Sequence, residues 1–154
     1  MDQVFGFVDL KAGQRVKAKG KPGENGSFMA LEIKVKTPDD QVAVEGLLQS
    51  IDQQNNTLCL LYRDFVLPDG IAVKHLQHNL IGLCGLKVGD MVKLKGRYTA
   101  VNGFVLEQIK MQETMGFNIE ELQGNLNSID LEKQTLDVLG FTVMVNKRTM
   151  IRGF

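Results

Sequence analysis

The sequence predicts an all-β protein of two small barrels that arise from an internal duplication. First, Leu10–Gly20 recurs as Leu86–Gly96, with seven of eleven residues identical. Second, Gly46–Leu58 recurs as Gly124–Leu136, so two blocks repeat in the same order. Third, apolar and polar residues alternate in short runs within both copies, which is the period of a strand with one buried face. Two repeated blocks in one order indicate duplication rather than chance.

The first expected hairpin of each copy follows from this alternation. Val16–Gly20 and Val92–Tyr98 alternate apolar with mainly basic residues. The returning strands are Phe28–Val35 and Phe104–Met111. In both returning strands the inward positions step by three residues at the same place, which predicts a β-bulge that bends the strand around a small barrel.

Three further strands are expected in each copy. In the first copy they are Val42–Ile51, Thr57–Tyr62 and Phe65–Leu67, and in the second they are Leu122–Ile129, Gln134–Leu139 and Phe141–Val145. Each copy therefore carries about five short strands joined mostly by hairpin-length turns, which is the pattern of an OB-like β-barrel.

One short helix is expected between Asp69 and Gly82, because Val73, Leu76 and Leu80 fall at helical spacing. His75 and His78 are three residues apart in the same segment. Two imidazoles without a carboxylate or cysteine partner do not make a metal site. We therefore expect no metal and no cofactor.

The order of the strands favours a discontinuous domain organisation. Residues 41–112 hold one complete set of five strands and form the expected central barrel. The chain ends, 1–37 plus 118–154, supply the second set and form the other barrel. The alternative is two sequential halves, 1–75 and 76–154. A third arrangement exchanges the halves between protomers, since duplicated hairpins swap easily.

Composition restricts the classes of function. The chain has 18 basic and 18 acidic side chains, which argues against the strongly basic surface of a general nucleic-acid binder. No stretch approaches the roughly 20 apolar residues of a membrane-spanning helix. The sequence contains no Gly-rich phosphate loop, serine elbow, HExxH motif or acidic metal loop. We therefore expect that the protein is not an enzyme.

The candidate ligand-binding residues are basic and lie on two equivalent strands. They are Arg15, Lys17 and Lys19 on one strand and Lys93, Lys95, Arg97 and Tyr98 on the other. Lysines that meet phosphates and aromatic rings that stack on bases would suit single-stranded nucleic acid. The aromatic side chains left for stacking are Tyr62, Tyr98 and Phe141. The competing interpretation is that these lysines solvate exposed strand faces and discourage edge pairing.

The repeated phrase resembles a bacterial family of unknown function. The residues that carry the resemblance are Leu86–Gly96, Asn102-Gly103, Ile109 and Gly124–Asp130, which match repeats containing the motif L-K-V-G-D-x-V-x-V-x-G. The resemblance covers about Leu10 to Val145 and implies OB-like barrels, often in tandem and often in exported or lipid-anchored proteins. Its motifs are structural, so they imply a fold and leave function open.

The resulting functional expectation is a non-catalytic tandem β-barrel module that binds a protein or cell-envelope partner. The alternative is single-stranded nucleic-acid binding through the lysine-rich strands. The resemblance favours export, to the periplasm or the cell surface, over the cytoplasm. A homodimer remains open, and so does the pairing of Cys59 with Cys84, which would suit an oxidising compartment.

Overall fold

The computed structural model describes residues 6–23, 26–37, 39–68, 71, 73–74, 80–81, 86–99, 101–112 and 120–153. In these ranges the chain is all β, apart from one short 3-10 helix, η1 (Phe7–Asp9). The strands of the first half are β1 (Arg15–Pro22), β2 (Ser27–Lys36), β3 (Val42–Leu47), β4 (Ser50–Asp52), β5 (Thr57–Leu60), β6 (Arg63–Val66) and β7 (Val73–Lys74). Those of the second half are β8 (Leu80–Ile81), β9 (Met91–Thr99), β10 (Gly103–Gln112), β11 (Glu120–Asp130), β12 (Thr135–Val138), β13 (Phe141–Met144) and β14 (Met150–Arg152).

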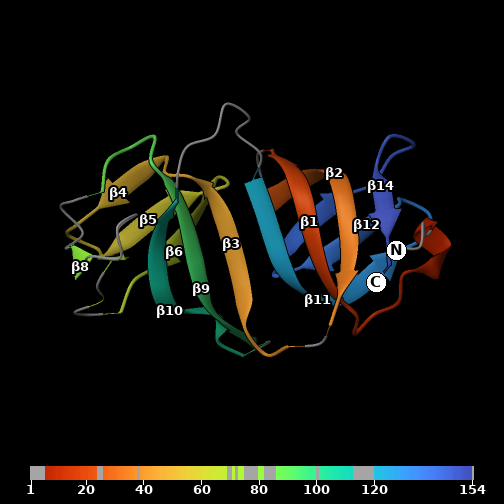
Figure 1. The fold of residues 1–154 in the computed structure, drawn as a ribbon, viewed down its shortest axis with the longest axis horizontal. Coiled ribbons are helices and arrows are strands. Elements are labelled where there is room, and N and C mark those ends of the chain that lie inside the picture. Colours follow the sequence, from red (N-terminus) through yellow and green to blue (C-terminus); the bar gives the residue numbers. More distant parts are fainter. Residues whose placement is uncertain are drawn as a thin grey trace.

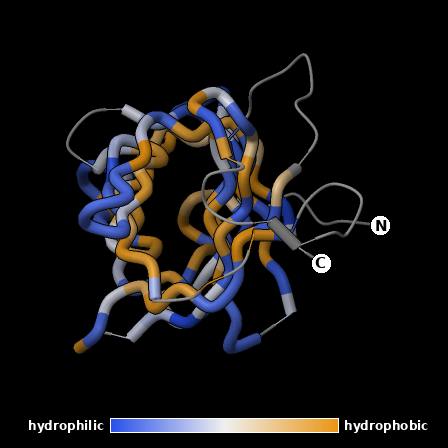
Figure 2. The backbone as a smooth tube through the Cα atoms, turned by 90° about the vertical axis from the view of Figure 1, so that its left-hand side faces the viewer, coloured by the Kyte–Doolittle hydropathy of each residue, from blue (hydrophilic) through white to orange (hydrophobic). Residues whose placement is uncertain are grey.

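Five of these strands close into a barrel with the order β1-β2-β13-β12-β11, and β11 pairs back to β1. The β2–β13 pair is parallel, and the other four pairs are antiparallel. The barrel thus takes two strands from the beginning of the chain and three from its end. Figure 2, seen from the left-hand side of Figure 1, shows the backbone tube of the whole molecule winding into a ring. Fully buried side chains such as Phe28, Ile33 and Phe141 pack in the core.

The central strands form a second assembly. β3 pairs with β9, β9 with β10, and β10 with the short parallel strand β7, while β4, β5 and β6 form a separate sheet. β6 and β10 share no ladder among the described residues. Their side chains nevertheless meet, because the rings of Phe65 and Phe104 pack edge to face with centroids 5.5 Å apart.

The two assemblies share one sheet through β3 and β11, and we name the pairing of these two strands the joint. These antiparallel strands place Val44 opposite Leu122 and Glu45 opposite Glu121. Figure 1 shows β9, β3, β11 and β1 side by side across the molecule. Val44 and Leu122 are both fully buried, so the core is continuous beneath the joint.

The strand pairings repeat between the two assemblies. Gly20 is opposite Glu120 in the β1–β11 pair, and Gly96 is opposite Val42 in the β3–β9 pair. The β-bulge predicted from the sequence is confirmed in both returning strands. The ladder register shifts beside Gly20 on β1–β2 and beside Leu106 on β9–β10.

The helix expected between Asp69 and Gly82 is wrong at the described positions. Val73–Lys74 and Leu80–Ile81 form the short strands β7 and β8, which pair with each other. Val73 is fully buried, because β7 adds to the edge of β10. His75, His78 and Cys84 lie outside the described residues. The described part of the chain has no helix long and apolar enough to cross a membrane.

Candidate functional site

The outer face of the shared sheet carries two rows of paired residues whose side chains are polar or charged, except for Ala43. One row, from β7 to β1, consists of Lys74, Lys110, Lys93, Glu45, Glu121 and Lys19. The other, from β14 to β9, consists of Arg152, Lys34, Lys17, Gln123, Ala43 and Lys95. Paired residues share a face of the sheet, so each row contains a run of three adjacent cations. These runs are Lys74, Lys110 and Lys93 in the first row, and Arg152, Lys34 and Lys17 in the second.

The predicted residues Lys17, Lys19, Lys93 and Lys95 all lie in these rows. Their charge is offset at the joint, since the Lys17 ammonium is 3.4 Å from a carboxylate oxygen of Glu121. On β7, β10 and β9, by contrast, the lysines Lys74, Lys110, Lys93 and Lys95 lie close together. Burial, followed by the charges of Lys93, Lys110 and Lys74, lowers the pKa of Lys95. The four predicted lysines therefore lie together on one face of the sheet, where Glu45 and Glu121 separate the lysines of β9 from those of β1.

Arg15, a candidate ligand-binding residue from the sequence, does not point into solvent. Its side chain is buried, and its guanidinium donates a hydrogen bond of 2.8 Å to the carbonyl of Asp39. The loop before β3 covers this end of β1, which alternation alone did not reveal. Arg15 is thus a structural contact in this conformation.

Arg97 and Tyr98 border a cleft of about 250 Å³ between the two assemblies, which we name the Tyr98 cleft. Its lining residues are Asp40, Val42, Arg97, Tyr98, Thr99, Asn125, Asn127 and Leu139. Nε of Arg97 lies 3.5 Å from a carboxylate oxygen of Glu107. Both side chains are exposed, so the guanidinium is accessible from solvent. Tyr98 is only half-exposed and packs partly on the core.

A second cleft, of about 500 Å³, lies at the other end of the joint and is named the Tyr62 cleft. Its lining residues are Lys21, Pro22, Leu47, Leu48, Gln49, Leu61, Tyr62, Val88, Gly89 and Glu120. Leu48 and Leu61 are buried, whereas Tyr62 and Val88 are 54% and 66% exposed. The cleft therefore combines an apolar wall with an exposed aromatic residue.

The two clefts use corresponding positions of the repeated sequence. Six pairs of lining residues are separated by 76 or 78 positions: Lys21 and Arg97, Pro22 and Tyr98, Val42 and Glu120, Leu47 and Asn125, Gln49 and Asn127, and Leu61 and Leu139. The joint is thus nearly symmetric in position but not in chemistry. Glu120 occurs in one cleft where Val42 occurs in the other.

Arg63 ties the two assemblies together beside these clefts. Its guanidinium donates hydrogen bonds of 2.8 Å to the carbonyls of Leu139 and Gly140. The same group lies over the ring of Phe141, 3.8 Å from its centroid. Phe141, expected as an exposed stacking residue, is fully buried beneath this contact. A planar, bidentate donor is well suited to such a joint.

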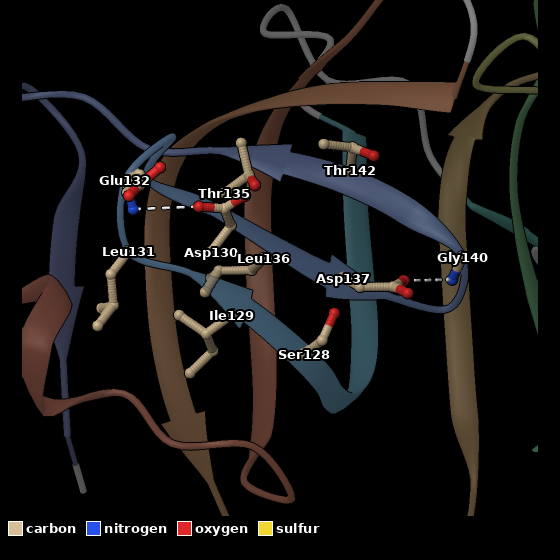
Figure 3. Close-up of a pocket in the computed structure, with 10 residues that line it drawn as sticks. All are labelled: Ser128, Ile129, Asp130, Leu131, Glu132, Thr135, Leu136, Asp137, Gly140 and Thr142. Atoms are coloured by element: carbon tan, nitrogen blue, oxygen red, sulfur yellow. Dashed lines mark hydrogen bonds between the residues drawn. The ribbon is translucent and has the colours of Figure 1, made fainter.

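A shallow depression of about 610 Å³ on the outside of β11–β13 carries several carboxylates (Figure 3). Asp130 accepts hydrogen bonds from the backbone amides of Glu132 and Lys133, and Asp137 accepts one from Gly140. These carboxylates therefore stabilise turns. Within the described ranges, no group of three or more His, Cys, Asp or Glu side chains is placed to hold a metal ion.

The residues that sequence reasoning missed are those of the Tyr62 cleft, above all Glu120. The signal available was the repeat itself, because Glu120 and Val42 occupy corresponding positions with opposite polarity. Tyr62 was considered only as a stacking residue for nucleic acid. Alternation identifies strand faces, whereas these clefts form where two assemblies meet.

Comparison with known families adds a partial match. A domain of unknown function, DUF5666, matches residues 2–34, which include η1, β1 and most of β2. This agrees with the resemblance to a family of unknown function and includes the first copy of the repeated phrase. No curated protein sequence and no solved structure gives a significant match to this chain.

Proposed function

We propose that this chain is a non-catalytic binding module of two OB-type barrels whose clefts receive side chains of a protein partner. The observation that carries the proposal is the pair of clefts at corresponding positions of the joint. Interfaces gain most of their binding free energy from a few anchors that fill such pockets. Exposed Tyr62 and Val88 supply the apolar and aromatic rim that protein partners favour.

The strand order of the closed barrel supports the OB-type assignment. Its antiparallel pairs and the single parallel pair β2–β13 form a five-stranded Greek-key arrangement. Both ends of the chain contribute, which supports a barrel made of 1–37 plus 118–154 beside a central barrel of 41–112. Side-chain packing between β6 and β10 supports closure of the central barrel.

Repeated local geometry supports the duplication. Positive φ angles recur at Asn56 and Gln134, 52° and 54°, and at Leu61 and Leu139, both 55°. The turns before β1 and β9 also repeat a contact. The backbone amide of Lys11 donates to Gln14, and that of Lys87 donates to Asp90, each at 2.8 Å.

Peptide display against the full chain tests this proposal. Selected peptides are expected to lose at least about tenfold in affinity for Tyr62→Ala or Tyr98→Ala, because anchor contacts are truncated. Val101→Ala and Leu131→Ala are the matched controls, since Val101 and Leu131 are exposed elsewhere. Equal binding to all four variants would place the interaction outside the clefts and refute the proposal.

Single-stranded nucleic acid is the second candidate, favoured by the row of Lys74, Lys110 and Lys93. In the order of an OB fold, β12 and β13 are the second and third strands, whose outer face binds oligonucleotides in such folds. This face argues against nucleic acid, because it carries Asp137 and is bordered by Asp130 at the end of β11. Labelled single-stranded DNA and RNA should be titrated at two salt concentrations. Salt-sensitive binding that Lys93→Glu with Lys95→Glu abolishes would support this candidate, and absence of binding at low salt would exclude it.

A further inference from the structure

Glu120 is a buried carboxylate that the fold leaves incompletely satisfied. The residue is 7% exposed, and its Oε2 has no hydrogen-bond partner. Burying a charged oxygen without a partner is costly, so such a group calls for an explanation. Burial is also the largest cause of the raised pKa of this carboxyl group, whereas the charge of Lys21 acts in the opposite direction.

The neighbouring residues make room for the Glu120 side chain. A Cβ atom on Gly46 would lie 3.2 Å from Cγ of Glu120 and 3.1 Å from the side chain of Leu61. At the corresponding position, a Cβ atom on Gly124 would meet Leu139 and Val42. The space beside this glycine is therefore filled by Leu139 and Val42 in one cleft, and by Leu61 and the methylene stem of Glu120 in the other.

Backbone strain marks the same cleft. Leu61 and Tyr62 both have positive φ angles, 55° and 59°, whereas the corresponding turn has Leu139 followed by Gly140. Non-glycine residues in this region are strained and concentrate at binding sites. Glycine would fit this position of the turn better than Tyr62 does. A binding role for the exposed tyrosine explains why a tyrosine is present there.

From these features we infer that the Tyr62 cleft binds the positively charged end of a lysine or arginine side chain of the protein partner. This inference rests on the proposed function. The cation pairs with Glu120, its alkyl stem lies along Leu48 and Leu61, and the ring of Tyr62 adds a cation–π contact. Lys21 also lines the cleft, so its like charge opposes the ligand and limits the affinity.

The test is an NMR titration of the full chain with capped single residues. The probes are N-acetyl-arginine amide and N-acetyl-lysine amide, with N-acetyl-norleucine amide as the uncharged control of similar length. The cationic probes are expected to shift resonances of the Tyr62 cleft and to bind at least about tenfold tighter than norleucine amide. Equal binding of norleucine amide would overturn the inference.

Variants locate the contact. Glu120→Gln keeps the size of the side chain and is expected to weaken binding of arginine amide at least about tenfold, whereas Lys21→Met is expected to strengthen it. Glu107→Gln, on the exposed side of β10, is the matched control and is expected to bind as the parent does. Glu120→Val, which copies the residue type of Val42, keeps the test available if Glu120→Gln does not fold. Unchanged binding by a folded Glu120 variant would overturn the inference.

Two further outcomes separate the possible failures. If n-butylamine binds at the cleft but the capped residues do not, the ligand is a small free amine and the inference of a protein side chain is overturned. If peptides selected by display depend on Tyr62 but carry no lysine or arginine, the proposed function stands and only this inference fails.

Discussion

At the scale of single residues, Tyr62 combines an unfavourable backbone conformation with an exposed position at the Tyr62 cleft. We expect Tyr62→Gly to raise the free energy of unfolding by about 1 kcal/mol, because relief of strain exceeds the entropy cost of glycine. Urea denaturation measures this change. The reverse control is Gly140→Ala, whose Cβ atom would lie 3.1 Å from the guanidinium of Arg63 and which should destabilise. A less stable Tyr62→Gly variant would mean that the ring contributes more than the strain costs.

Arg63 is the second residue whose single contacts have a large expected effect. Arg63→Ala removes two charge-assisted hydrogen bonds and the contact with Phe141, so we expect a loss of about 2–3 kcal/mol in unfolding free energy. Arg97→Ala is the control, since its pair with Glu107 is exposed and should contribute less than about 1 kcal/mol. Equal losses from both substitutions, measured by urea denaturation, would show that Arg63 does not join the assemblies.

At the scale of elements, the bulged hairpins depend on one glycine each. A Cβ atom on Gly96 would lie 2.0 Å from the carbonyl oxygen of Val105, and one on Gly20 would lie 2.0 Å from that of Met29. We expect Gly96→Ala and Gly20→Ala each to lower the unfolding free energy by about 1–3 kcal/mol, because backbone must move. Gly6→Ala, with 3.6 Å to its nearest neighbour, is the control. Thermal unfolding that is unchanged for Gly96→Ala would contradict this close approach.

The same elements show what could be predicted from sequence. The alternation of apolar and polar residues located β1, β9 and the bulges, because in a half-buried strand a period of two alone decides which side chains point inward. The carboxylates of Asp52 and Asp130 accept hydrogen bonds from backbone amides two and three residues ahead, and the place of each residue between an isoleucine and a turn is sufficient to predict this capping role. The strand β7 could not be predicted in this way. Two residues carry no period, and Val73 is placed by its pairing with β10.

At the scale of the whole molecule, the joint between β3 and β11 was outside the reach of sequence patterns. Both strands follow the same template, and nothing in that template specifies that Val44 lies opposite Leu122. The pairing joins positions that correspond in the repeated sequence blocks, as in an isologous interface between subunits. The clefts and the rows of charges arise from this pairing, which explains why strand alternation alone did not single out Glu120.

The joint also makes stability depend on pH. Burial, followed by the charge of Glu121, raises the pKa of Glu45 above its ordinary value. The folded state therefore binds more protons than the unfolded state between the ordinary and the raised pKa, so this carboxyl group lowers stability as pH rises through that window. We expect Glu45→Gln to remove this decrease, so that the variant gains stability relative to the parent as the pH rises above the ordinary pKa of a glutamate and through the raised pKa of Glu45.

Urea denaturation of the parent and of Glu45→Gln at one-unit pH steps measures the difference between their unfolding free energies. The other titrating groups are common to both proteins, so their contributions cancel in this difference. Glu107→Gln controls for the removal of a carboxylate from an exposed strand position. Asp39 and Asp52, whose pKa values are lowered by hydrogen bonds from backbone and side-chain amides, affect both proteins alike and oppose the trend at acid pH. A difference that does not change with pH would mean that Lys93, Lys17 and Lys19 fully compensate Glu45 in the joint. The two acidic side chains would then not strain the contact between the assemblies.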